Sequence, residues 1–484
     1  MSNRKILNFI DGEYTEGTSG KSFEVINPVD GSISAVVTEA SAADVDRAVT
    51  AARAALEGEW GQMAVKTRLD LLDAVADGIM AHQQDFIDAE ISDTGKPYGQ
   101  VAHMEIPRAA DQFRVFLKIV AAGGKNEIID TLLPDGGVAH NREFRKPKGV
   151  IAAVCPWNLP LVMATWKAAP ALAWGNTMVL KPSEETPSTA ALLGMVMNEA
   201  GIPKGVFNVV HGFGENSAGG FLVAHPGVDA INFTGETRTG EAIMKSSAVG
   251  LRDVSLELGG KNPCIVFADC NFAAAIEGIA KSCFFNCGQI CLGTERLYVE
   301  QSIFDKFVVA LKNAAESQTI GPAVGPTHQK KILSYYRLAE QEGATVVTGG
   351  GIPKVNEALV GGAWVQPTIW TGLPEKARLL KEEVFGPCCH IQPFVREEDA
   401  IRMANDSLYG LAACVWSGDE GKARRVAEAL NVGVCWINGW MVRDLRTAFG
   451  GVGMSGIGRE GGIYSMEFHT ELKNICTIMS PATV

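Results

Sequence analysis

The stretches VIAAVCPWN at residues 150–158 and TMVLKPSE at residues 177–184 each join a short, uninterrupted apolar run to proline and polar residues. Runs of the same kind recur as VFNVV (206–210), AINF (230–233) and VSLEL (254–258), and segments of helical character lie between them. Continuous apolar runs bounded by Gly, Pro and Asn are typical of parallel strands that are buried on both faces. The alternation of such strands with helices predicts a doubly wound α/β fold.

A second alternation of apolar runs and helical segments follows the first. It begins with PCIVFAD (263–269), passes through RLYVE (296–300) and extends to GVCWIN (433–438). Because the glycines of Leu258-Gly259-Gly260 separate the two alternations, we place a domain boundary near these residues. The chain is therefore predicted to contain two α/β units.

The first hundred residues are predicted to be mainly helical. A helix at residues 41–57 begins with Ser41 three residues before Asp44, which is the spacing of a capping box. A further helix is predicted after Thr186, which acts as its cap, with Pro187 in the first turn.

Two segments far apart in the sequence, residues 139–147 and 468–479, alternate polar and apolar positions. This period of two is typical of strands that have one face exposed. We expect the two segments to pair with each other, with pairing between subunits as one arrangement.

The composition limits the kind of protein this is. A length of 484 residues, with 46% apolar and 20% charged residues, predicts two or three globular domains. No apolar run reaches the roughly 18–20 residues of a membrane span, and the start of the chain lacks an export signal, so we expect a cytoplasmic protein outside the membrane. A formal charge of -12 disfavours nucleic acid as a partner. Eleven cysteines, an odd number, favour free thiols over a disulfide framework.

Ligands of doubly wound sheets bind where the strands end, so the residues after each apolar run are candidates for a binding site. These segments are CPWN (155–158), KPSE (181–184), HGFGENSAGG (211–220), FTGETRTG (233–240) and ELGGK (257–261). The glycines in them do not have the spacing of the dinucleotide fingerprint G-x-G-x-x-G. In KPSE, Glu184 beside Lys181 fits an acceptor for ribose hydroxyls, and an exposed charged pair at a strand end is the alternative.

Glu257 lies within the apolar strand pattern VSLEL, so its carboxyl group is expected to face the protein interior. Burial raises the pKa of a carboxyl group and makes it a useful base near neutral pH. A satisfied salt bridge is the structural alternative.

The stretch CFFNCGQIC (283–291) contains three cysteines at intervals of four. If residues 271–287 form a helix, Cys283 and Cys287 share one face as small buried residues, and Gly288 ends the helix. Cys291 then lies in a loop between Gly288 and Gly293, where its sulfur can be accessible. No C-x-x-C pair or nearby histidine completes a zinc site, so we expect no bound metal. An inert loop cysteine and a nucleophile remain the two interpretations of Cys291.

Seven motifs in order along the chain carry a resemblance to a known family. They are PWN, KPSE, FTGETRTG, ELGGKNP, GQICLG, EEVFGP and FGGVGMSGIGRE, between residues 156 and 460. Together they resemble the NAD(P)-dependent aldehyde dehydrogenase superfamily, and the resemblance covers the whole chain. It implies an aldehyde dehydrogenase-like α/β fold with two doubly wound Rossmann-type domains and a small β oligomerisation element. The implied divisions are an NAD-binding domain at 1–121 and 148–259, a catalytic domain at 260–440, an oligomerisation element at 122–147 and 465–484, and a return segment at 441–464.

The resemblance also implies roles for individual residues. Cys291 matches the nucleophile, Glu257 the general base and Asn158 the side-chain oxyanion donor. The cofactor implied is NAD, and the residues that match its contacts are Trp157, Lys181, Ser183, Glu184, Gly214, Phe233, Thr234, Gly235, Glu236, Gly240, Leu258, Gly259, Glu383 and Phe385. These roles imply oxidation of an aldehyde to an acid through a thiohemiacetal and a thioester on Cys291.

Within the superfamily, stretches such as EIPRAADQFRVF (105–116) and VRDLRTAFGG (442–451) resemble the semialdehyde dehydrogenases of aromatic ring cleavage by the meta pathway. The resemblance implies a small-molecule substrate, a hydroxy-substituted muconic semialdehyde, with the amino-substituted compound as the alternative, and a homo-oligomer, dimer or tetramer. Arg108 and Arg446, together with Asn158, match the substrate-binding positions, and Arg443 lies close to the second arginine. A guanidinium can bind the substrate carboxylate bidentately, whereas ordinary salt bridges are the alternative.

The chain departs from the superfamily pattern at two places, and three other functions are alternatives to this prediction. Glu236 stands where many members have a small Ser, and residues 317–331 form a stretch about ten residues shorter than is usual in the superfamily. A cysteine hydrolase or acyltransferase without nucleotide, a CoA-acylating enzyme and a non-enzymatic structural relative are the alternatives. The KPSE and EEVFGP stretches argue against the first, and Glu257 favours hydrolysis over transfer to CoA.

Overall fold

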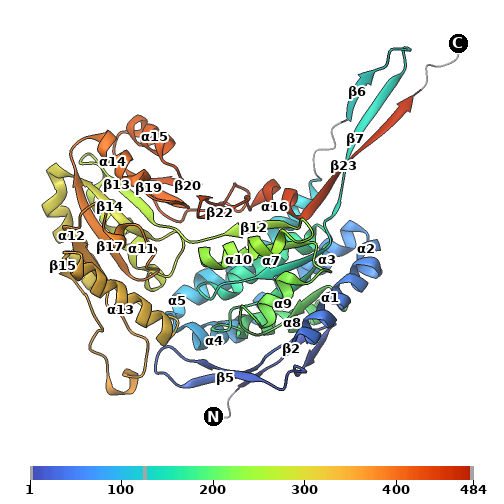
Figure 1. Ribbon diagram of the computed structural model, residues 1–484, viewed down its shortest axis with the longest axis horizontal. Coiled ribbons are helices and arrows are strands. Elements are labelled where there is room, and N and C mark those ends of the chain that lie inside the picture. Colours follow the sequence, from blue (N-terminus) through green and yellow to red (C-terminus); the bar gives the residue numbers. More distant parts are fainter. Residues whose placement is uncertain (1–3, 124–127, 480–484) are drawn as a thin grey trace.

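The computed structural model describes residues 4–123 and 128–479, and two large sheets form its framework. Figure 1 shows two α/β bodies side by side, with a narrow β arm that projects away from them. The strands β12 (Asp253–Glu257) and β13 (Asn262–Val266) follow each other in the chain but belong to different sheets. The chain therefore passes from one sheet to the other at residues 258–261, where the domain boundary was predicted.

The first sheet has eight strands in the order β22-β12-β11-β8-β9-β10-β2-β3. Its five central strands, which the apolar runs predicted, are mutually parallel, and short antiparallel strands flank them. Besides β12, its strands are β22 (Gly456–Ile457), β11 (Ala230–Thr234), β8 (Val150–Val154), β9 (Thr177–Lys181), β10 (Phe207–Val209), β2 (Asn8–Ile10) and β3 (Glu13–Thr15).

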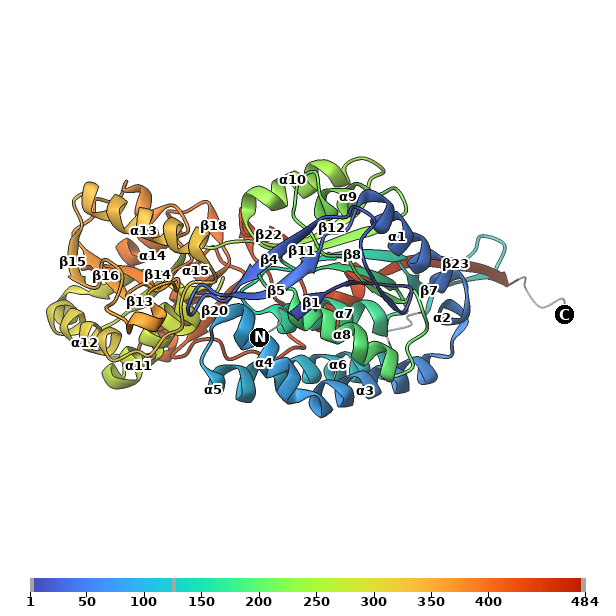
Figure 2. The same ribbon diagram turned by 90° about the horizontal axis from the view of Figure 1, so that it is seen from below.

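Helices cover both faces of this sheet, as Figure 2 shows. Successive residues of β8 point to opposite faces: Ile151 and Ala153 belong to one hydrophobic core, and Val150, Ala152 and Val154 to the other. The helices of the first core are α3 (Val65–Ala81), α6 (Ile106–Ala121), α7 (Pro160–Ala173) and α8 (Ser188–Glu199), and those of the second are α1 (Ala42–Glu57), α9 (Ala218–Ala224) and α10 (Thr237–Ser247). The predicted doubly wound arrangement is confirmed.

The second sheet has seven strands in the order β15-β16-β17-β14-β13-β19-β20, all parallel except β15. Its other strands are β15 (Thr345–Thr348), β16 (Thr368–Thr371), β17 (Cys388–Phe394), β14 (Thr294–Glu300), β19 (Ala412–Trp416) and β20 (Val434–Ile437). The surrounding helices are α11 (Phe272–Phe284), α12 (Phe304–Glu316), α13 (Pro326–Gln341), α14 (Glu397–Asn405) and α15 (Glu420–Ala429). The second predicted α/β unit is thus confirmed as well.

The projecting arm is a three-stranded sheet of β6 (Ile128–Leu132), β7 (Val138–Pro147) and β23 (Thr470–Met479). The strands β23 and β7 pair antiparallel from Thr470 opposite Pro147 to Met479 opposite Val138. The predicted pairing of these two segments is confirmed within one chain. Residues 124–127 and 480–484 of the predicted oligomerisation element lie outside the described residues.

The prediction that the first hundred residues are mainly helical is confirmed from α1 (Ala42–Glu57) onward, but it missed the strands that precede this helix. Ser41 and Asp44 do form the capping box of α1, but five strands precede that helix. These strands have three to six residues each, which is too short for their alternation to stand out in the sequence. The strands not yet named are β1 (Arg4–Ile6), β4 (Ser22–Ile26) and β5 (Ile33–Thr38), and the remaining helices here are α2 (Glu59–Gln62), α4 (Gln83–Thr94) and α5 (Tyr98–Gln100).

Thr186 does not cap α8, which begins at Ser188. The hydroxyl of Thr186 is buried without a hydrogen-bond partner in the described structure. The backbone N–H of Ser188 instead donates to the carboxylate of Asp93 at 3.0 Å. A carboxylate from a distant helix therefore replaces the local cap, which the local sequence does not reveal.

The remaining elements are short or lie near the end of the chain. They are a π-helix (Val101–Glu105), 3-10 helices (Phe285–Gly288, Gln301–Ile303, Glu357–Leu359 and Arg378–Leu380), β18 (Tyr409–Gly410), β21 (Val452–Gly453) and α16 (Gly462–His469). Among the described residues, no helix has the length and apolar character needed to cross a membrane.

Candidate active site

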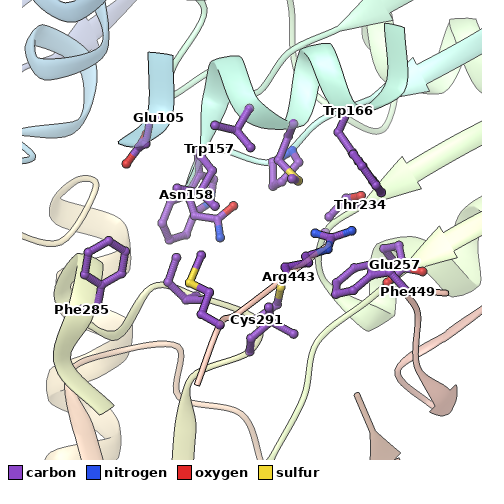
Figure 3. Close-up of a pocket in the computed structure, with 18 of the residues that line it drawn as sticks. Glu105, Trp157, Asn158, Trp166, Thr234, Glu257, Phe285, Cys291, Arg443 and Phe449 are labelled. Atoms are coloured by element: carbon purple, nitrogen blue, oxygen red, sulfur yellow. The ribbon is translucent and has the colours of Figure 1, made fainter. Parts of the chain in front are cut away.

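A cavity of about 710 Å³ lies where the two sheets meet, and residues from both of them line it. Thr234 and Glu257 come from the carboxyl ends of β11 and β12, and Asn158 follows β8. Cys291 comes from the loop before β14 of the second sheet. Figure 3 shows the side chains of Asn158, Glu257 and Cys291 around one common space. The fold thus brings together the three residues to which the resemblance assigned catalytic roles.

The loop that carries Cys291 departs from the predicted helix. The helix α11 ends at Phe284, and Asn286 and Cys287 adopt left-handed backbone conformations with φ of 55° and 57°. Gly288 is also left-handed at φ 67°, and a Cβ atom there would lie 2.0 Å from the carbonyl oxygen of Gly386. The expectation that Cys283 and Cys287 share one helical face is therefore wrong, although both are buried.

The thiol of Cys291 is not activated by its protein surroundings alone. Burial raises its pKa to about 12, the carboxylates of Glu257 and Glu383 act in the same direction, and the guanidinium of Arg443 opposes them. At neutral pH the sulfur therefore carries its proton. Because the thiolate is the nucleophile, attack on a ligand requires a base or an added positive charge in the cavity.

Asn158 lies between β8 and α7, and its side-chain amide is held in place. The Nδ2 atom donates to the backbone carbonyl of Gln289 at 2.9 Å, and the side chain of Asn286 donates to the backbone carbonyl of Asn158 at 3.0 Å. An amide nitrogen carries two hydrogens, so one N–H of Asn158 remains for a ligand in the cavity.

Glu257 is buried at the end of β12, and neither carboxyl oxygen has a hydrogen-bond partner in the described structure. Burial raises its pKa well above the usual value, and the nearby Glu460 adds to the shift, while Lys167, Arg443 and Arg459 oppose it. The predicted raised pKa of Glu257 is thus confirmed, and the alternative of a satisfied salt bridge is excluded. A buried carboxyl without partners is suited to take a proton from a ligand.

Lys167 and Glu460 belong to the same site, and the sequence analysis missed both. The Nζ atom of Lys167 donates to Asn232 at 2.5 Å and to Thr234 at 2.8 Å, and it lies 3.8 Å from Glu460. The indole N–H of Trp166 also donates to Glu460. The sequence did contain a signal for Lys167, because it is the only charged residue of helix α7, whose other residues are almost all apolar.

The three arginines of interest occupy different surroundings. Arg108 and Arg443 line the cavity, and the partly buried Arg443 packs against Phe449 and Trp166, with its guanidinium carbon 3.6 Å and 4.4 Å from the two ring centroids. Burial lowers the pKa of Arg443 to about 10, so it remains a cation at neutral pH. One of its terminal nitrogens has no hydrogen-bond partner among the described residues.

Arg446 is not among the residues that line the cavity. Its side chain is 73% exposed, and its Nε atom donates to the carboxylate of Asp444 at 2.9 Å. The structure therefore does not bring Arg446 to the position that the resemblance implied. Arg443, three residues earlier, points to that cavity instead.

Of the residues predicted to bind the cofactor, eight line the cavity and six lie beyond it. The lining residues are Trp157, Thr234, Gly235, Glu236, Leu258, Gly259, Glu383 and Phe385, and the others are Lys181, Ser183, Glu184, Gly214, Phe233 and Gly240. The Nζ atom of Lys181 lies 3.1 Å from Glu184, whose side chain is 35% exposed at the end of β9. A carboxylate that is held in place yet accessible has the geometry that ribose hydroxyls require, so these residues fit a dinucleotide.

Two further contacts support this fit. The backbone N–H of Gly260 donates to Glu383 at 2.7 Å, and a Cβ atom on Gly259 would lie 2.3 Å from the Glu383 carboxylate.

The side chain of Glu236 is half-exposed and lies 3.3 Å from Arg238, so its charge is directed to solvent. This glutamate therefore does not block a pyrophosphate in the first sheet. Within the described residues, no cluster of three or more His, Cys, Asp or Glu side chains could hold a metal ion.

Comparison with known proteins agrees with this fold. The sequence profile of the aldehyde dehydrogenase family matches residues 14–475, so the chain belongs to that family. It is 57% identical to a 2-hydroxymuconic semialdehyde dehydrogenase of Pseudomonas sp. (strain CF600) over 98% of this chain and 99% of that protein. It is 50% identical to a 2-aminomuconic 6-semialdehyde dehydrogenase of Pseudomonas sp., with 98% of each chain covered.

Among solved structures, the fold is similar to that of betaine aldehyde dehydrogenase from Staphylococcus aureus in complex with NAD+. The TM-score is 0.94 at 37% sequence identity, and the comparison covers 99% of this chain and 96% of the other. The aldehyde dehydrogenase-like fold that the sequence predicted is confirmed.

Proposed function

We propose that this enzyme oxidises 2-hydroxymuconic semialdehyde to the dicarboxylic acid with NAD+ as the oxidant, in the meta-cleavage breakdown of aromatic compounds. The observation that carries the proposal is the guanidinium of Arg443, which has one terminal nitrogen buried without a hydrogen-bond partner in the described structure, in the same cavity as Cys291 and Glu257. A buried guanidinium N–H without a protein acceptor favours a ligand that accepts a hydrogen bond, and an anionic ligand also matches the positive charge. The high identity to a 2-hydroxymuconic semialdehyde dehydrogenase supplies an aldehyde with a carboxylate at its other end.

Arg108 and Arg443 are proposed to bind the substrate carboxylate together. The guanidinium of Arg108 donates to the backbone carbonyl of Arg443 at 3.5 Å, so the two residues share one wall of the cavity. Two guanidinium groups can bind both oxygens of a carboxylate and fix its direction. With the carboxylate held there, the long axis of the substrate can extend toward Cys291 and present the aldehyde to its sulfur.

The first half of the reaction is the formation of a thioester on Cys291. Glu257 is the base within the cavity that can accept the thiol proton, and the thiolate then adds to the aldehyde carbon. The free N–H of Asn158 and the backbone N–H of Cys291 stabilise the oxyanion of the resulting thiohemiacetal. When bound, NAD+ supplies the acceptor for the hydride that leaves this carbon. Collapse of the oxyanion expels the hydride with its electron pair and leaves the thioester.

The second half is hydrolysis of the thioester. Once the thiol proton has left Glu257, its carboxylate accepts a proton from a water molecule, whose oxygen adds to the thioester carbon. The tetrahedral intermediate expels the Cys291 thiolate, and the carboxylic acid is released. The proton must then leave the buried Glu257, and Lys167 and Glu460 are the charged groups that adjoin it.

Residues of both sheets are proposed to hold the cofactor. Lys181 and Glu184 would bind the adenosine ribose, with the remaining predicted contacts in the first sheet beside them. Glu383 and Phe385 would bind the nicotinamide ribose. The negative charge of Glu184 disfavours a 2′-phosphate, which supports NAD+ over NADP+.

The β arm supports a homo-oligomer, either a dimer or a tetramer. It exposes large apolar side chains on both outer strands, among them Leu132 of β6 at 79% and Met479 of β23 at 51% of their full surface, and the register places these two on one face of the sheet. An apolar patch of this kind on a projecting sheet is typical of a surface that another copy of the chain covers. The eleven cysteines are all free thiols, which supports a location in the reducing cytoplasm.

The second candidate substrate is 2-aminomuconic semialdehyde, because a relative at 50% identity is named for it. Both semialdehydes carry the carboxylate that Arg443 would bind, so this residue does not separate them. A cysteine hydrolase without nucleotide is disfavoured, because the Lys181–Glu184 pair and Glu383 then have no ligand to bind.

The proposal can be tested by the appearance of NADH absorbance at 340 nm. We expect kcat/KM for 2-hydroxymuconic semialdehyde to exceed that for hexanal by at least 100-fold, with the 2-amino compound between them. Absence of NADH in the presence of NAD+, or equal values for the carboxylated and the neutral aldehyde, would overturn it. If the amino compound is the better substrate, the second candidate replaces the first.

A further inference from the structure

Near Asn158 lies a buried group of ionisable residues, Glu90, Lys96 and Glu105, which no step of the proposed reaction uses. Lys96 donates to Glu90 at 3.0 Å and to Glu105 at 2.7 Å. The Lys96 side chain is only 5% exposed, and both carboxylates are fully buried. Glu90 also accepts the backbone N–H of Leu161, in the first turn of α7, at 3.4 Å. Asn158 immediately precedes this helix, so the acidic group holds the chain just after it.

Two amide side chains link this group to Asn158. The Nε2 atom of Gln100 donates to Glu105 at 2.8 Å and to the side-chain oxygen of Asn286 at 3.1 Å. Asn286 in turn donates to the backbone carbonyl of Asn158 at 3.0 Å and to that of Gln289 at 3.2 Å. The backbone carbonyl of Gln289 also accepts a hydrogen bond from the side-chain amide of Asn158. Gln100 is therefore the link between the charged group and the expected oxyanion donor.

These contacts close into one cycle, which we call the Asn158 ring. Its members are Glu90, Lys96, Gln100, Glu105, Asn286 and Asn158, with the first turn of α7 between the last and the first. The side chains of the ring come from three separate parts of the chain, residues 90–105, 158 and 286. Such a closed arrangement restricts the Asn158 backbone more than any single hydrogen bond would.

The ring also forms part of the cavity wall. Glu105 (Figure 3) lies on the π-helical turn Val101–Glu105, and it is one of the residues that line the cavity. His103 and Met104 of the same turn line it as well. Isolated π-helical turns occur frequently at functional sites. Buried ion pairs contribute little net stability, because desolvation offsets their attraction. Fixed geometry beside the reacting groups is the better explanation of why three ionisable groups are buried here.

We infer that Gln100 is a positioning residue, which ties the π-helical turn to Asn286 and thereby aims the free N–H of Asn158 at the substrate oxygen. The inference rests on the proposed function, in which Asn158 stabilises the oxyanion. Removing an oxyanion donor outright costs about 10²–10³ in rate, and a misplacement by about 1 Å can cost about 10²-fold. Loss of the Gln100 link is therefore expected to lower the rate of hydride transfer by about 10- to 100-fold.

The test is a double-mutant cycle between Gln100→Met and Asn158→Ala, with kcat/KM measured for 2-hydroxymuconic semialdehyde and for hexanal. Methionine has nearly the length of glutamine but forms none of its hydrogen bonds. We expect Gln100→Met to lower kcat/KM by about 10- to 100-fold for both aldehydes and to leave the Kd for NAD+ within twofold. In the Asn158→Ala background the same change should alter kcat/KM by less than about threefold, because a residue that acts through Asn158 has nothing left to position.

A matched control is Gln83→Met. Gln83 donates to the backbone carbonyl of Ala102 in the same π-helical turn at 3.0 Å but lies outside the ring. This variant should retain at least half of the wild-type kcat/KM. If Gln100→Met does not fold, Gln100→Asn replaces it, since the shorter amide cannot reach both Glu105 and Asn286.

Three results would overturn the inference: wild-type activity in the Gln100 variant, losses that multiply in the double variant, or an equal loss in Gln83→Met. Failure of the proposed function would instead appear in the wild-type enzyme, as no NADH formed from any aldehyde.

Discussion

The loop at residues 285–293 and the segment at residues 440–446 each contain two identical residues of which one reaches the cavity. In the loop, Cys291 lines the cavity, whereas Cys287 packs into a separate hydrophobic cluster with Tyr336. In the segment, Arg443 lines the cavity, whereas Arg446 is exposed and paired with a neighbouring carboxylate. The same side chain therefore has a chemical role in one position and a structural or solvent-facing one a few residues away.

The two regions differ in what separates their members. In the loop, three consecutive left-handed residues ending at Gly288 reverse the chain between the cysteines, and a glycine in this position is visible in the sequence. In the segment, neither arginine lies in a helix or strand, so no period assigns them to different faces. There, the stacking of Arg443 on Phe449 and Trp166 determines which arginine faces the cavity. Local signals thus distinguish the cysteines, and only long-range contacts distinguish the arginines.

The largest effect is expected for the cysteine pair. Cys291→Ala should lower kcat by at least about 10³-fold, because removal of the attacking atom leaves only binding and electrostatic contributions. Cys287→Ala should retain more than half of kcat and lose about 1 kcal/mol of stability, since it only removes a buried sulfur. The measurements are steady-state NADH formation and thermal unfolding. Comparable losses of activity in both variants would mean that the loop does not separate the two roles.

An intermediate effect is expected for the arginine pair. Arg443→Gln should raise KM for the carboxylated semialdehyde by about 10- to 100-fold, because hydrogen bonds to charged groups contribute about 1.5–3 kcal/mol. Arg446→Gln, the matched control, should change KM by less than twofold. With hexanal as substrate, neither variant should change KM by more than about threefold. The comparison fails if Arg446→Gln has the larger effect on the carboxylated substrate, in which case the loop at 440–446 must rearrange on binding.

The smallest effect extends the comparison to two buried carboxylates, Glu257 and Glu460. Glu460 has hydrogen-bond partners and Glu257 has none, so we expect only Glu257 to act as the base. A base is active in its deprotonated form, so the rate of thioester hydrolysis should rise with pH through the raised pKa of Glu257. Glu460→Gln removes a negative charge that raises this pKa, and the rise should therefore move to lower pH.

The measurement is the pH dependence of acyl-enzyme hydrolysis in single-turnover experiments. Glu340→Gln, on the exposed face of α13, provides the control and should not move the profile. A shift of the profile to higher pH in Glu460→Gln would contradict the assignment, because it would mean that Glu460 lowers the pKa of Glu257.

Much of the fold could be predicted because its signals are local. The five parallel strands of the first sheet appeared as apolar runs, and the capping box of α1 appeared as Ser41 and Asp44. The cap of α8 could not be predicted, because its acceptor, Asp93, lies 95 positions from Ser188 in the sequence. The short N-terminal strands could not be predicted either, since three residues do not establish a period.

The sequence by itself determined which residue types stand at the ends of strands and at chain reversals, and it thereby placed Cys291, Glu257 and Asn158 in candidate segments. Their catalytic roles were implied by the family resemblance. Periodicity and turn chemistry act over a few residues, so one sequence is enough to read them. Only the tertiary structure decided that Glu257 has no partner, that Lys167 and Glu460 adjoin it, and that Arg443 rather than Arg446 faces the cavity. These facts depend on how the ends of two separate sheets meet, and the free energy of that packing is distributed over residues far apart in the chain.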